Sequence, residues 1–302
     1  MTPEERTRIE ANLFPASRPA IGSWDSFRWH HDRQKRVDTW KPHSSQALAI
    51  DVFGLLQVVD SSERDLILND LADRIGVASG GPWTVELEWE DADNRLHEKA
   101  KTQVDAVARS PRSLIFFECK FTESDGGTCS QPSALTSGAN KGIRQCNGNY
   151  EPQLNPLNCI ESKCALSGKG IRYWDVIPSV FDFSSSSDQS PCPFAGSWYQ
   201  WMRNLTLAYE FAHDSARDAA FVVVYADAPE LPMAQLVASL EWQDFVGHVR
   251  RDAIAFDTIS YQQLLEGAVQ ALLTGGQDVA MWHDLGSWVE RKIVQAVSGV
   301  DD

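Results

Sequence analysis

The segment TQVDAVARSPRSLIFFECKF (residues 102–121) constrains the fold most, because it places three charged side chains inside two otherwise apolar stretches. The two stretches are rich in Val, Ile and Phe and flank the polar link SPRS, which predicts an antiparallel β-hairpin. A charged side chain in so apolar a strand is costly to bury unless a partner compensates it. We therefore expect Asp105, Glu118 and Lys120 to form one polar site.

The length of the turn fixes which residues face each other. If the SPRS link forms the turn, Arg109 pairs with Leu114, and the same register places Asp105 opposite Glu118. Directly opposed residues have Cβ atoms about 4.5–5.5 Å apart, and Lys120 follows on the same face about 6–7 Å along the strand. Two facing carboxylates repel unless a cation lies between them, and oxygen ligands with room for water suit Mg²⁺ or Mn²⁺.

The acid-x-Lys triplet alone carries little weight. Chance predicts roughly one such triplet in a chain of this composition, and the sequence contains three, ECK at 118, ESK at 161 and ERK at 290. Only the first follows an apolar strand and has an acid across a predicted hairpin. This context distinguishes Glu118 and Lys120 from the other two matches.

The rest of the chain alternates between helical and extended patterns. Three strands joined by short links favour an antiparallel meander, and a following helix lets a fourth strand return beside them. The fold class is therefore α/β, with a mixed central sheet flanked by helices in the order αβββαβ. The predicted helices are residues 44–56, 63–75, 195–215, 233–250, 261–273 and 278–298, and the predicted strands are 83–90, 103–109, 113–121, 219–227 and 254–261.

These residues and their order resemble the PD-(D/E)XK nuclease superfamily. Asp105, twelve intervening residues and then Glu118-Cys119-Lys120 match its motif, and the segments SSQALAIDVFG, ECKFTES and WYQWMRN resemble a bacterial restriction-endonuclease-like branch of it. The resemblance implies a Mg²⁺- or Mn²⁺-dependent endodeoxyribonuclease that acts in restriction, defence or repair. It also implies that Asp105 and Glu118 hold the metal, while Lys120 orients or activates the attacking water.

The resemblance covers about residues 44–227 of a chain that we expect to form one nuclease-like domain, residues 1–302. Residues 122–195 are rich in Gly, Ser, Asn, Pro and Cys and predict a long irregular insertion in the core. Residues 228–302 predict a C-terminal α/β extension.

Two features depart from the motif or extend it. Val104 stands where the motif's name has Pro. The helix after the strands often carries a Gln in this superfamily, and here Gln200, Arg203 and Asn204 project from one side of the predicted helix, where they could approach the metal or a phosphate. Gln46, near the start of the first helix, is a weaker candidate for substrate binding.

The glutamates of the predicted strand 83–90 have a different expected role. Val85, Leu87 and Trp89 alternate with three acids. We interpret Glu86 and Glu88 as a solvated strand face rather than as additional metal ligands.

The net charge of −15 disfavours a uniformly nucleic-acid-binding surface, since phosphate contacts require Lys and Arg. Two segments are locally basic, however: residues 126–174, which include Lys141 and Arg144, and RWHHDRQKR at 28–36. These are the places where DNA would contact the chain. A homodimer or an unidentified protein partner is compatible with the sequence.

Six cysteines without a secretory leader predict reduced thiols or a metal site rather than a disulfide framework. Five of them lie between residues 129 and 192, with no C-x-x-C pair. Ordinary free thiols are therefore favoured over structural Zn²⁺, whose sites usually show closely spaced ligand pairs, and an iron–sulfur cluster is disfavoured further.

The charged N-terminal segment and the short apolar runs predict a cytoplasmic protein without membrane spans. Two other functions are compatible with the sequence. A nuclease-like scaffold could bind nucleic acid or a partner without cleavage, and two carboxylates about 5 Å apart would suit a retaining glycosidase. The glycosidase is disfavoured because Lys120 has no role in it.

Overall fold

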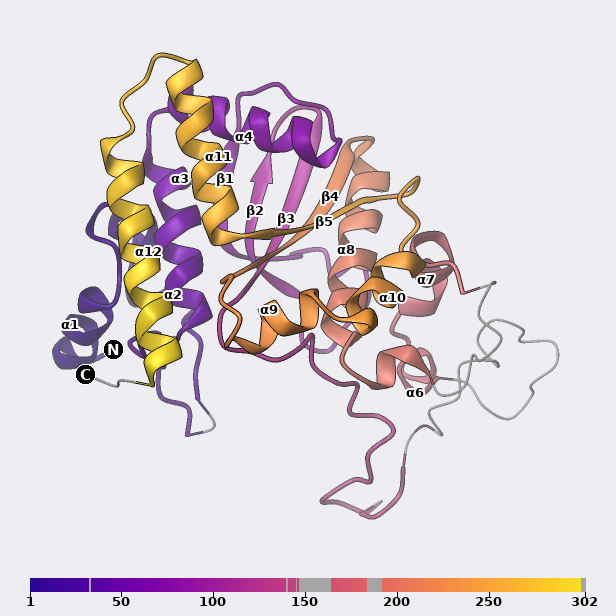
Figure 1. Ribbon diagram of the computed structural model, residues 1–302. Coiled ribbons are helices and arrows are strands. Elements are labelled where there is room, and N and C mark those ends of the chain that lie inside the picture. Colours follow the sequence, from indigo (N-terminus) through magenta and orange to yellow (C-terminus); the bar gives the residue numbers. More distant parts are fainter. Residues whose placement is uncertain (33, 140, 145, 147–163, 184–191, 300–302) are drawn as a thin grey trace.

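A computed structural model describes residues 1–32, 34–139, 141–144, 146, 164–183 and 192–299 (Figure 1). Its centre is a five-stranded mixed sheet in the order β1-β2-β3-β4-β5. The first three strands are antiparallel neighbours, and β4 and β5 extend the sheet in parallel from β3. The strands are β1 (Thr84–Glu90), β2 (Gln103–Arg109), β3 (Ser113–Lys120), β4 (Asp218–Tyr225) and β5 (Ala255–Ser260).

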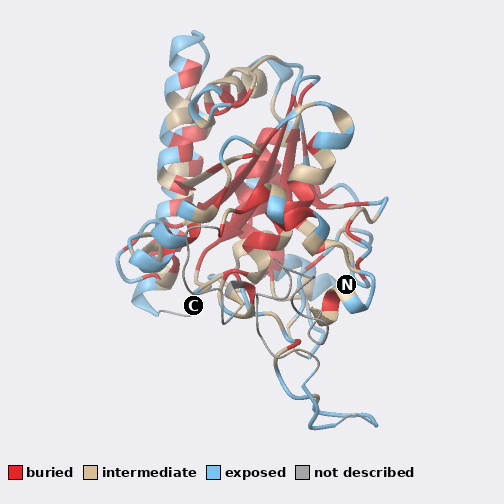
Figure 2. Cartoon of the chain, turned by 90° about the vertical axis from the view of Figure 1, so that its right-hand side faces the viewer, coloured by how far each residue is buried: buried red, intermediate tan, exposed pale blue. Residues whose placement is uncertain are grey.

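Helices cover both faces of the sheet, so the strands form the buried centre of the molecule (Figures 1 and 2). One face carries α2 (Ser45–Ala49), η2 (Ile50–Gly54), α3 (Leu55–Val58), α4 (Ser61–Ile75), α11 (Tyr261–Thr274) and α12 (Ala280–Ser298). The other face carries α7 (Tyr173–Val180), α8 (Tyr199–Ser215) and α10 (Leu240–His248). The shorter elements are α1 (Pro3–Ala11), η1 (Pro15–Ile21), α6 (Ala165–Gly168), η3 (Pro193–Ala195) and α9 (Pro232–Val237). The predicted α/β class and αβββαβ order are confirmed.

The predicted hairpin register is also confirmed, because Arg109 pairs with Leu114 and the ladder continues in the same register to Ala106 and Phe117. This ladder ends one residue before Asp105 and Glu118. The Asp105 carboxylate instead accepts a hydrogen bond from the backbone N–H of Cys119, at 2.6 Å from Oδ2.

The prediction that β1 has a regular solvated face is wrong at Glu88. Glu86 is exposed, whereas Glu88 is only 4% exposed. The φ angle of Glu88 is +50°, in the left-handed region that non-glycine residues rarely adopt. This turn of the backbone breaks the alternation: Leu87 packs in the core under α2–α4, whereas Trp89 packs in the core under α8.

Two other predictions of regular structure need correction. The helix predicted at 233–250 is two helices, α9 and α10, because Ser239 interrupts the first and caps the second by accepting from Trp242 N. The insertion at 122–195 is not irregular throughout, since α7 buries Val176 and Ile177 in the core beside α8.

The helical segment that contains α2 is capped by Ser44, whose side chain accepts a hydrogen bond from Ala47 N. One turn of π-helix in its middle contains the buried Asp51. Lys292 of α12 donates to Asp51 Oδ2 at 2.7 Å, and Trp288 donates to the same oxygen at 2.9 Å. The C-terminal helix is thereby joined to the helix that packs behind β2 and β3.

In the part of the chain that the structure describes, helices combining enough length with enough apolar character to cross a bilayer are absent.

Candidate active site

A cavity of about 230 Å³ opens at the ends of β1, β2 and β3, beside the first turns of α8. Asp105, Glu118 and Lys120 all line this cavity, together with Gln200 and Arg203 from α8. The remaining lining residues are His30, Ser45, Glu88, Gln103, Cys119 and Glu123. The structure therefore brings the three predicted catalytic residues together.

Glu118 is held by amides of α8 and by the neighbouring lysine. Asn204 Nδ2 donates to Glu118 Oε2 at 2.7 Å, and Gln200 Nε2 donates to Oε1. Lys120 Nζ lies 3.0 Å from the same Oε1 and donates to Gln200 Oε1 at 2.8 Å. Helix α8 thus fixes the orientation of both the carboxylate and the ammonium group of β3.

Two residues of the site were not predicted as ligands, Glu88 and His30. Glu88 accepts hydrogen bonds from Gln46 Nε2 at 2.6 Å and from Gln103 Nε2, and His30 Nε2 lies 3.5 Å from Glu88 Oε2. The break in alternation of β1 turns Glu88 inward, and this was not visible in the sequence. His30 lies in the segment that we interpreted as a basic patch, and its backbone N–H is held by Gln46 at 2.9 Å.

The donor set at this position fits a divalent cation. One ligand atom each from His30, Glu88 and Asp105 lie within 4.8 Å of one another. Carboxylate oxygens suit Mg²⁺ and Mn²⁺, and an imidazole nitrogen is a common ligand for transition metals. This group contains the predicted ligand Asp105 and adds Glu88 and His30. The predicted ligand Glu118 lines the same cavity but is not one of the three residues whose ligand atoms converge.

The charges in the cavity act strongly on one another. Burial and then the negative charges of Glu118 and Glu88 raise the pKa of Asp105 well above its ordinary value. Burial lowers the pKa of His30, but the hydrogen bond and charge of Glu88 outweigh it and raise that pKa to about 9, although 45% of the side chain is exposed. A cation among these carboxylates would relieve their repulsion.

Lys120 is a hydrogen-bond donor in this environment rather than a base. Burial lowers the pKa of Lys120, but the charges of Glu118, Glu123 and Asp105 outweigh it and raise the pKa. The ammonium group has three donors, two of which are directed to Gln200 and Glu118. The ammonium group also lies over the ring of Trp201, 5.3 Å from its centroid.

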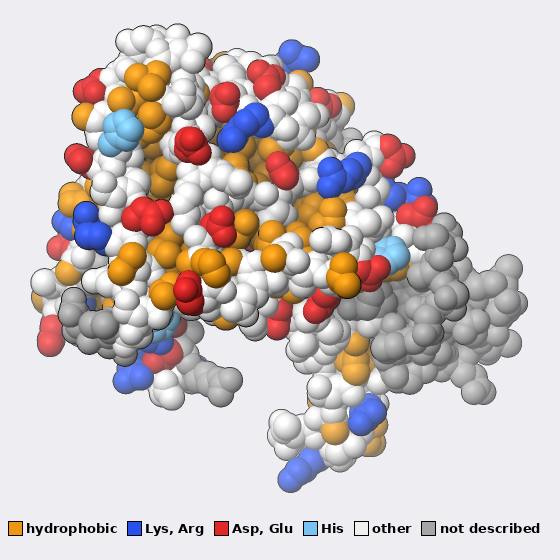
Figure 3. Space-filling view, in the orientation of Figure 1, with side chains coloured by type: hydrophobic (Ala, Val, Ile, Leu, Met, Phe, Trp, Pro, Cys, Tyr) orange, Lys and Arg blue, Asp and Glu red, His pale blue; other side chains and the backbone are white. Residues whose placement is uncertain are grey.

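The other predicted substrate-binding residues lie in different positions. Arg203 lines the cavity, and its Nε is buried without a hydrogen-bond partner among the described residues. Asn204 and Gln46 are fully buried behind Glu118 and Glu88 and do not line the cavity. Lys141 and Arg144 are exposed in the segment after β3, away from the cavity lining. That segment projects from the body of the molecule and carries basic side chains, whereas acidic and basic groups are interspersed over the adjoining surface (Figure 3).

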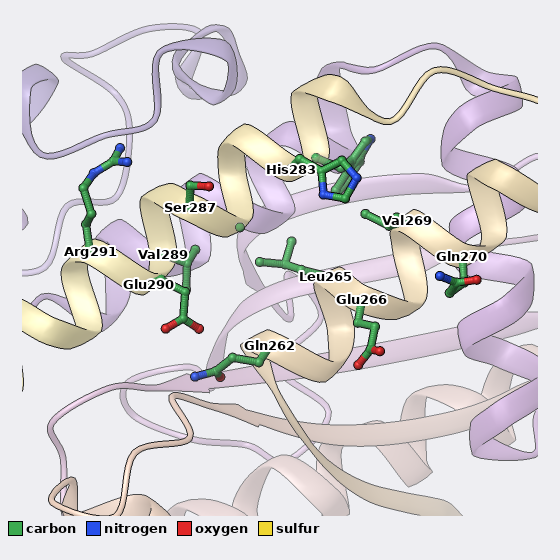
Figure 4. A pocket seen from close by; sticks show the side chains of 12 residues that line it. Gln262, Leu265, Glu266, Val269, Gln270, His283, Ser287, Val289, Glu290 and Arg291 are labelled. Atoms are coloured by element: carbon green, nitrogen blue, oxygen red, sulfur yellow. The ribbon is translucent and has the colours of Figure 1, made fainter.

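A larger cavity, of about 700 Å³, lies between α11 and α12 (Figure 4). Its polar lining includes His283, Glu290 and Arg291, which point from α12, and Glu266 and Gln270 from α11. Among the described residues, no group of three metal-ligating side chains converges there. The smaller cavity with the carboxylates is therefore the better candidate for an active site.

Comparison with known proteins assigns the chain to a family. Residues 22–283 match the model of a family described as restriction endonuclease associating with ARP. The comparison with curated proteins and the comparison with solved structures each gave no match. The matched region contains all five strands and every residue that lines the candidate active site. The chain therefore belongs to this family of restriction endonucleases, and its mixed sheet with flanking helices agrees with a restriction-endonuclease-like fold.

Proposed function

We propose that the protein is a nuclease that hydrolyses phosphodiester bonds of DNA with Mg²⁺ or Mn²⁺. The observation that carries the proposal is the convergence of Asp105, Glu118 and Lys120 in one cavity of a chain from a restriction endonuclease family. Phosphodiester hydrolysis requires a nucleophilic water, its orientation, and stabilisation of negative charge on the phosphate.

Asp105, Glu88 and His30, whose ligand atoms converge, would hold the cation, and Glu118, which lines the same cavity, would contribute a further carboxylate. When bound, such a cation lowers the pKa of water and stabilises the negative charge that develops on the phosphate. Glu118 accepts two hydrogen bonds from α8 amides, which fix the direction of its carboxylate. Outer partners of this kind set the direction of ligand lone pairs.

Lys120 would orient the attacking water through its remaining N–H. Its other two donors are fixed by Gln200 and Glu118, so the direction of the third is determined by the protein. Because the charges around it raise its pKa, Lys120 stays protonated and does not remove the proton itself. A carboxylate that faces the cavity would receive that proton.

Arg203 would bind a phosphate of the substrate. Its buried Nε has no partner among the described residues, and a guanidinium group matches the oxygens of a phosphate. Lys141 and Arg144 would contact the DNA backbone farther away, from the projecting segment. Phosphate contacts position DNA without reading its sequence.

We also propose that the protein associates with ARP, because the family's description names this association. The experiment therefore includes the chain alone and the chain with ARP.

Supercoiled plasmid, linear duplex and single-stranded DNA are incubated with the purified chain in Mg²⁺, Mn²⁺, Ca²⁺ or EDTA. We expect cleavage in Mg²⁺ or Mn²⁺, and binding without cleavage in Ca²⁺, whose looser coordination positions water poorly. Efficient cleavage in EDTA would contradict the metal-dependent proposal. Binding without cleavage in every metal, with and without ARP, would instead support a non-cleaving scaffold.

A further inference from the structure

Four cysteines from distant parts of the chain surround a third, much smaller cavity. Cys129, Cys146, Cys164 and Cys192 line a cavity of about 30 Å³, although at least sixteen residues separate each from the next. Cys129 interacts electrostatically with Cys164 and Cys146, and Cys192 interacts with Cys164 and Cys129. These thiols are therefore neighbours in space despite the absence of a C-x-x-C pair.

The surroundings of the thiols are apolar and ordered by hydrogen bonds. Trp174 and Phe194 line the cavity, with ring centroids 6.1 Å apart. Lys169 Nζ donates to Gln131 Oε1 at 2.5 Å, which joins the segment of Cys129 to the segment that follows α6. An apolar shell of this kind excludes water from a metal–thiolate centre.

We propose that Cys129, Cys146, Cys164 and Cys192 bind one structural Zn²⁺ ion. Four thiolates are a common donor set for structural zinc, with Zn–S distances of about 2.3 Å. A cavity of about 30 Å³ has room for a single ion. The proposal replaces the expectation of ordinary free thiols and is independent of the nuclease activity.

Zinc would draw the sulfur atoms inward. Among the described residues, the metal-ligating group whose atoms all lie within 4.8 Å of one another is His30, Glu88 and Asp105, so the cysteine sulfurs are more widely spaced. Tetrahedral zinc places its sulfurs about 3.8 Å apart. Cys129 and Cys146 lie outside helices and strands. Cys164 and Cys192 are the N-cap residues of α6 and η3, and their carbonyls accept hydrogen bonds from Gly168 N and Ala195 N, so the contraction would come from their side chains.

The proposed zinc site shares one wall with the active site. Tyr199 and Met202 of α8 line the thiol cavity, while Gln200 and Arg203 of the same helix line the cavity of Glu118. The chain that leads to Cys129 is also fixed to this helix, because Gln200 N donates to Gly126 O at 2.7 Å. Zinc would therefore stabilise the start of α8, which orients Glu118 and Lys120.

The first test is the metal content of the full chain, purified under reducing conditions without chelator. We expect about one Zn²⁺ per chain, and at least a fivefold loss in Cys129→Ser and in Cys164→Ser. Cys119→Ala, which removes a buried thiol in β3 outside the thiol cavity, should retain the zinc. Asp105→Asn should also retain it, because the active-site cation is a separate ion.

A second measurement uses the wild-type chain and does not depend on the folding of variants. Replacement of zinc by Co²⁺ should give the thiolate-to-cobalt charge-transfer band and the intense visible bands of tetrahedral cobalt. A zinc chelator should lower the Tm, and Zn²⁺ but not Mg²⁺ should restore it. A zinc-free protein whose Tm does not respond to Zn²⁺, zinc retained in full by Cys129→Ser, or bound iron in place of zinc would overturn the proposal.

Discussion

Asn204 of α8 donates a hydrogen bond to Glu118 of β3, with 2.7 Å between Nδ2 and Oε2. Both residues are buried, so water does not replace this bond when it is lost. The bond links the helix after the insertion directly to the strand that carries the proposed metal ligand. Helix α8 therefore determines the geometry of the candidate active site.

Asn204→Ala should lower kcat for DNA cleavage about 10- to 100-fold, the usual effect of removing a partner that orients a metal ligand. Glu118 keeps its charge in this variant but loses one of the two amides that fix its direction. Single-turnover cleavage rates at saturating metal measure the effect. His213→Ala, at the exposed end of the same helix, is the matched control and should cleave normally. Equal rates for Asn204→Ala and wild type would show that this bond does not orient the ligand.

Glu88→Gln should weaken Mn²⁺ binding at least about tenfold, because it removes one negative ligand from the cavity. Isothermal titration with Mn²⁺ measures the affinity directly. Glu86→Gln is the matched control on the same strand, since Glu86 is exposed and bonds Arg109 at 2.9 Å. The same affinity in both variants would place the cation away from Glu88.

The hairpin could be predicted from the sequence, because a four-residue turn between two apolar strands fixes the register. That register brought Asp105, Glu118 and Lys120 together, and the helical spacing of Gln200 and Arg203 placed them on the side of the site. The hairpin register and the helix face depend on the alternation within strands and the spacing within a helix, both of which are read directly from the sequence.

Glu88 and His30 could not be assigned in the same way. The inward direction of Glu88 depends on a left-handed backbone conformation that breaks the strand alternation. His30 reaches the site from a loop that is held by Gln46, a contact between residues sixteen positions apart with no periodic pattern. The convergence of the cysteines depends likewise on how the insertion folds against α8, which spacing in the chain does not reveal.

The double variant Lys141→Ala and Arg144→Ala should bind DNA more weakly than wild type. The slope of log affinity against log salt concentration should fall by about 1.8, because two phosphate contacts are lost. Both side chains are exposed on the projecting segment. Lys99→Ala with Arg251→Ala removes the same charge from other exposed positions and should leave the slope unchanged. If the first pair has no effect on the slope, the basic segment at 28–36 becomes the next candidate for the contact.

Lys292→Met should destabilise the fold by about 3–5 kcal/mol, because it leaves Asp51 buried without its cation. Urea unfolding measures the loss of unfolding free energy. Adding Asp51→Asn to the Lys292→Met variant should restore part of that loss, because no buried charge is then left unpaired. Arg291→Met is the matched control, since Arg291 is exposed and lies over the face of Trp288, 5.4 Å from the ring centroid. Equal losses of unfolding free energy in Lys292→Met and Arg291→Met would mean that the buried ion pair of Asp51 and Lys292 does not stabilise the fold.

The same pair predicts a pH dependence. Burial lowers the pKa of Lys292 below its ordinary value of 10.5, although the charge of Asp51 opposes this. Between the lowered pKa and 10.5, the unfolded chain holds a proton that the folded chain has released, so stability rises with pH in this window. The free energy of unfolding of wild type relative to Lys292→Met should therefore increase as the pH approaches 10.5. A difference that falls over this range would contradict the direction of the shift.

Cleavage of supercoiled plasmid by Glu118→Gln, Asp105→Asn and Lys120→Ala, each compared with wild type in Mg²⁺ and Mn²⁺, tests the central claim most directly. Because the three groups act as one unit, each variant should lose cleavage by at least about a thousandfold, with a circular dichroism spectrum like that of wild type. Wild-type rates of cleavage in a folded Lys120→Ala or Glu118→Gln variant would contradict the assignment of this cavity as the active site.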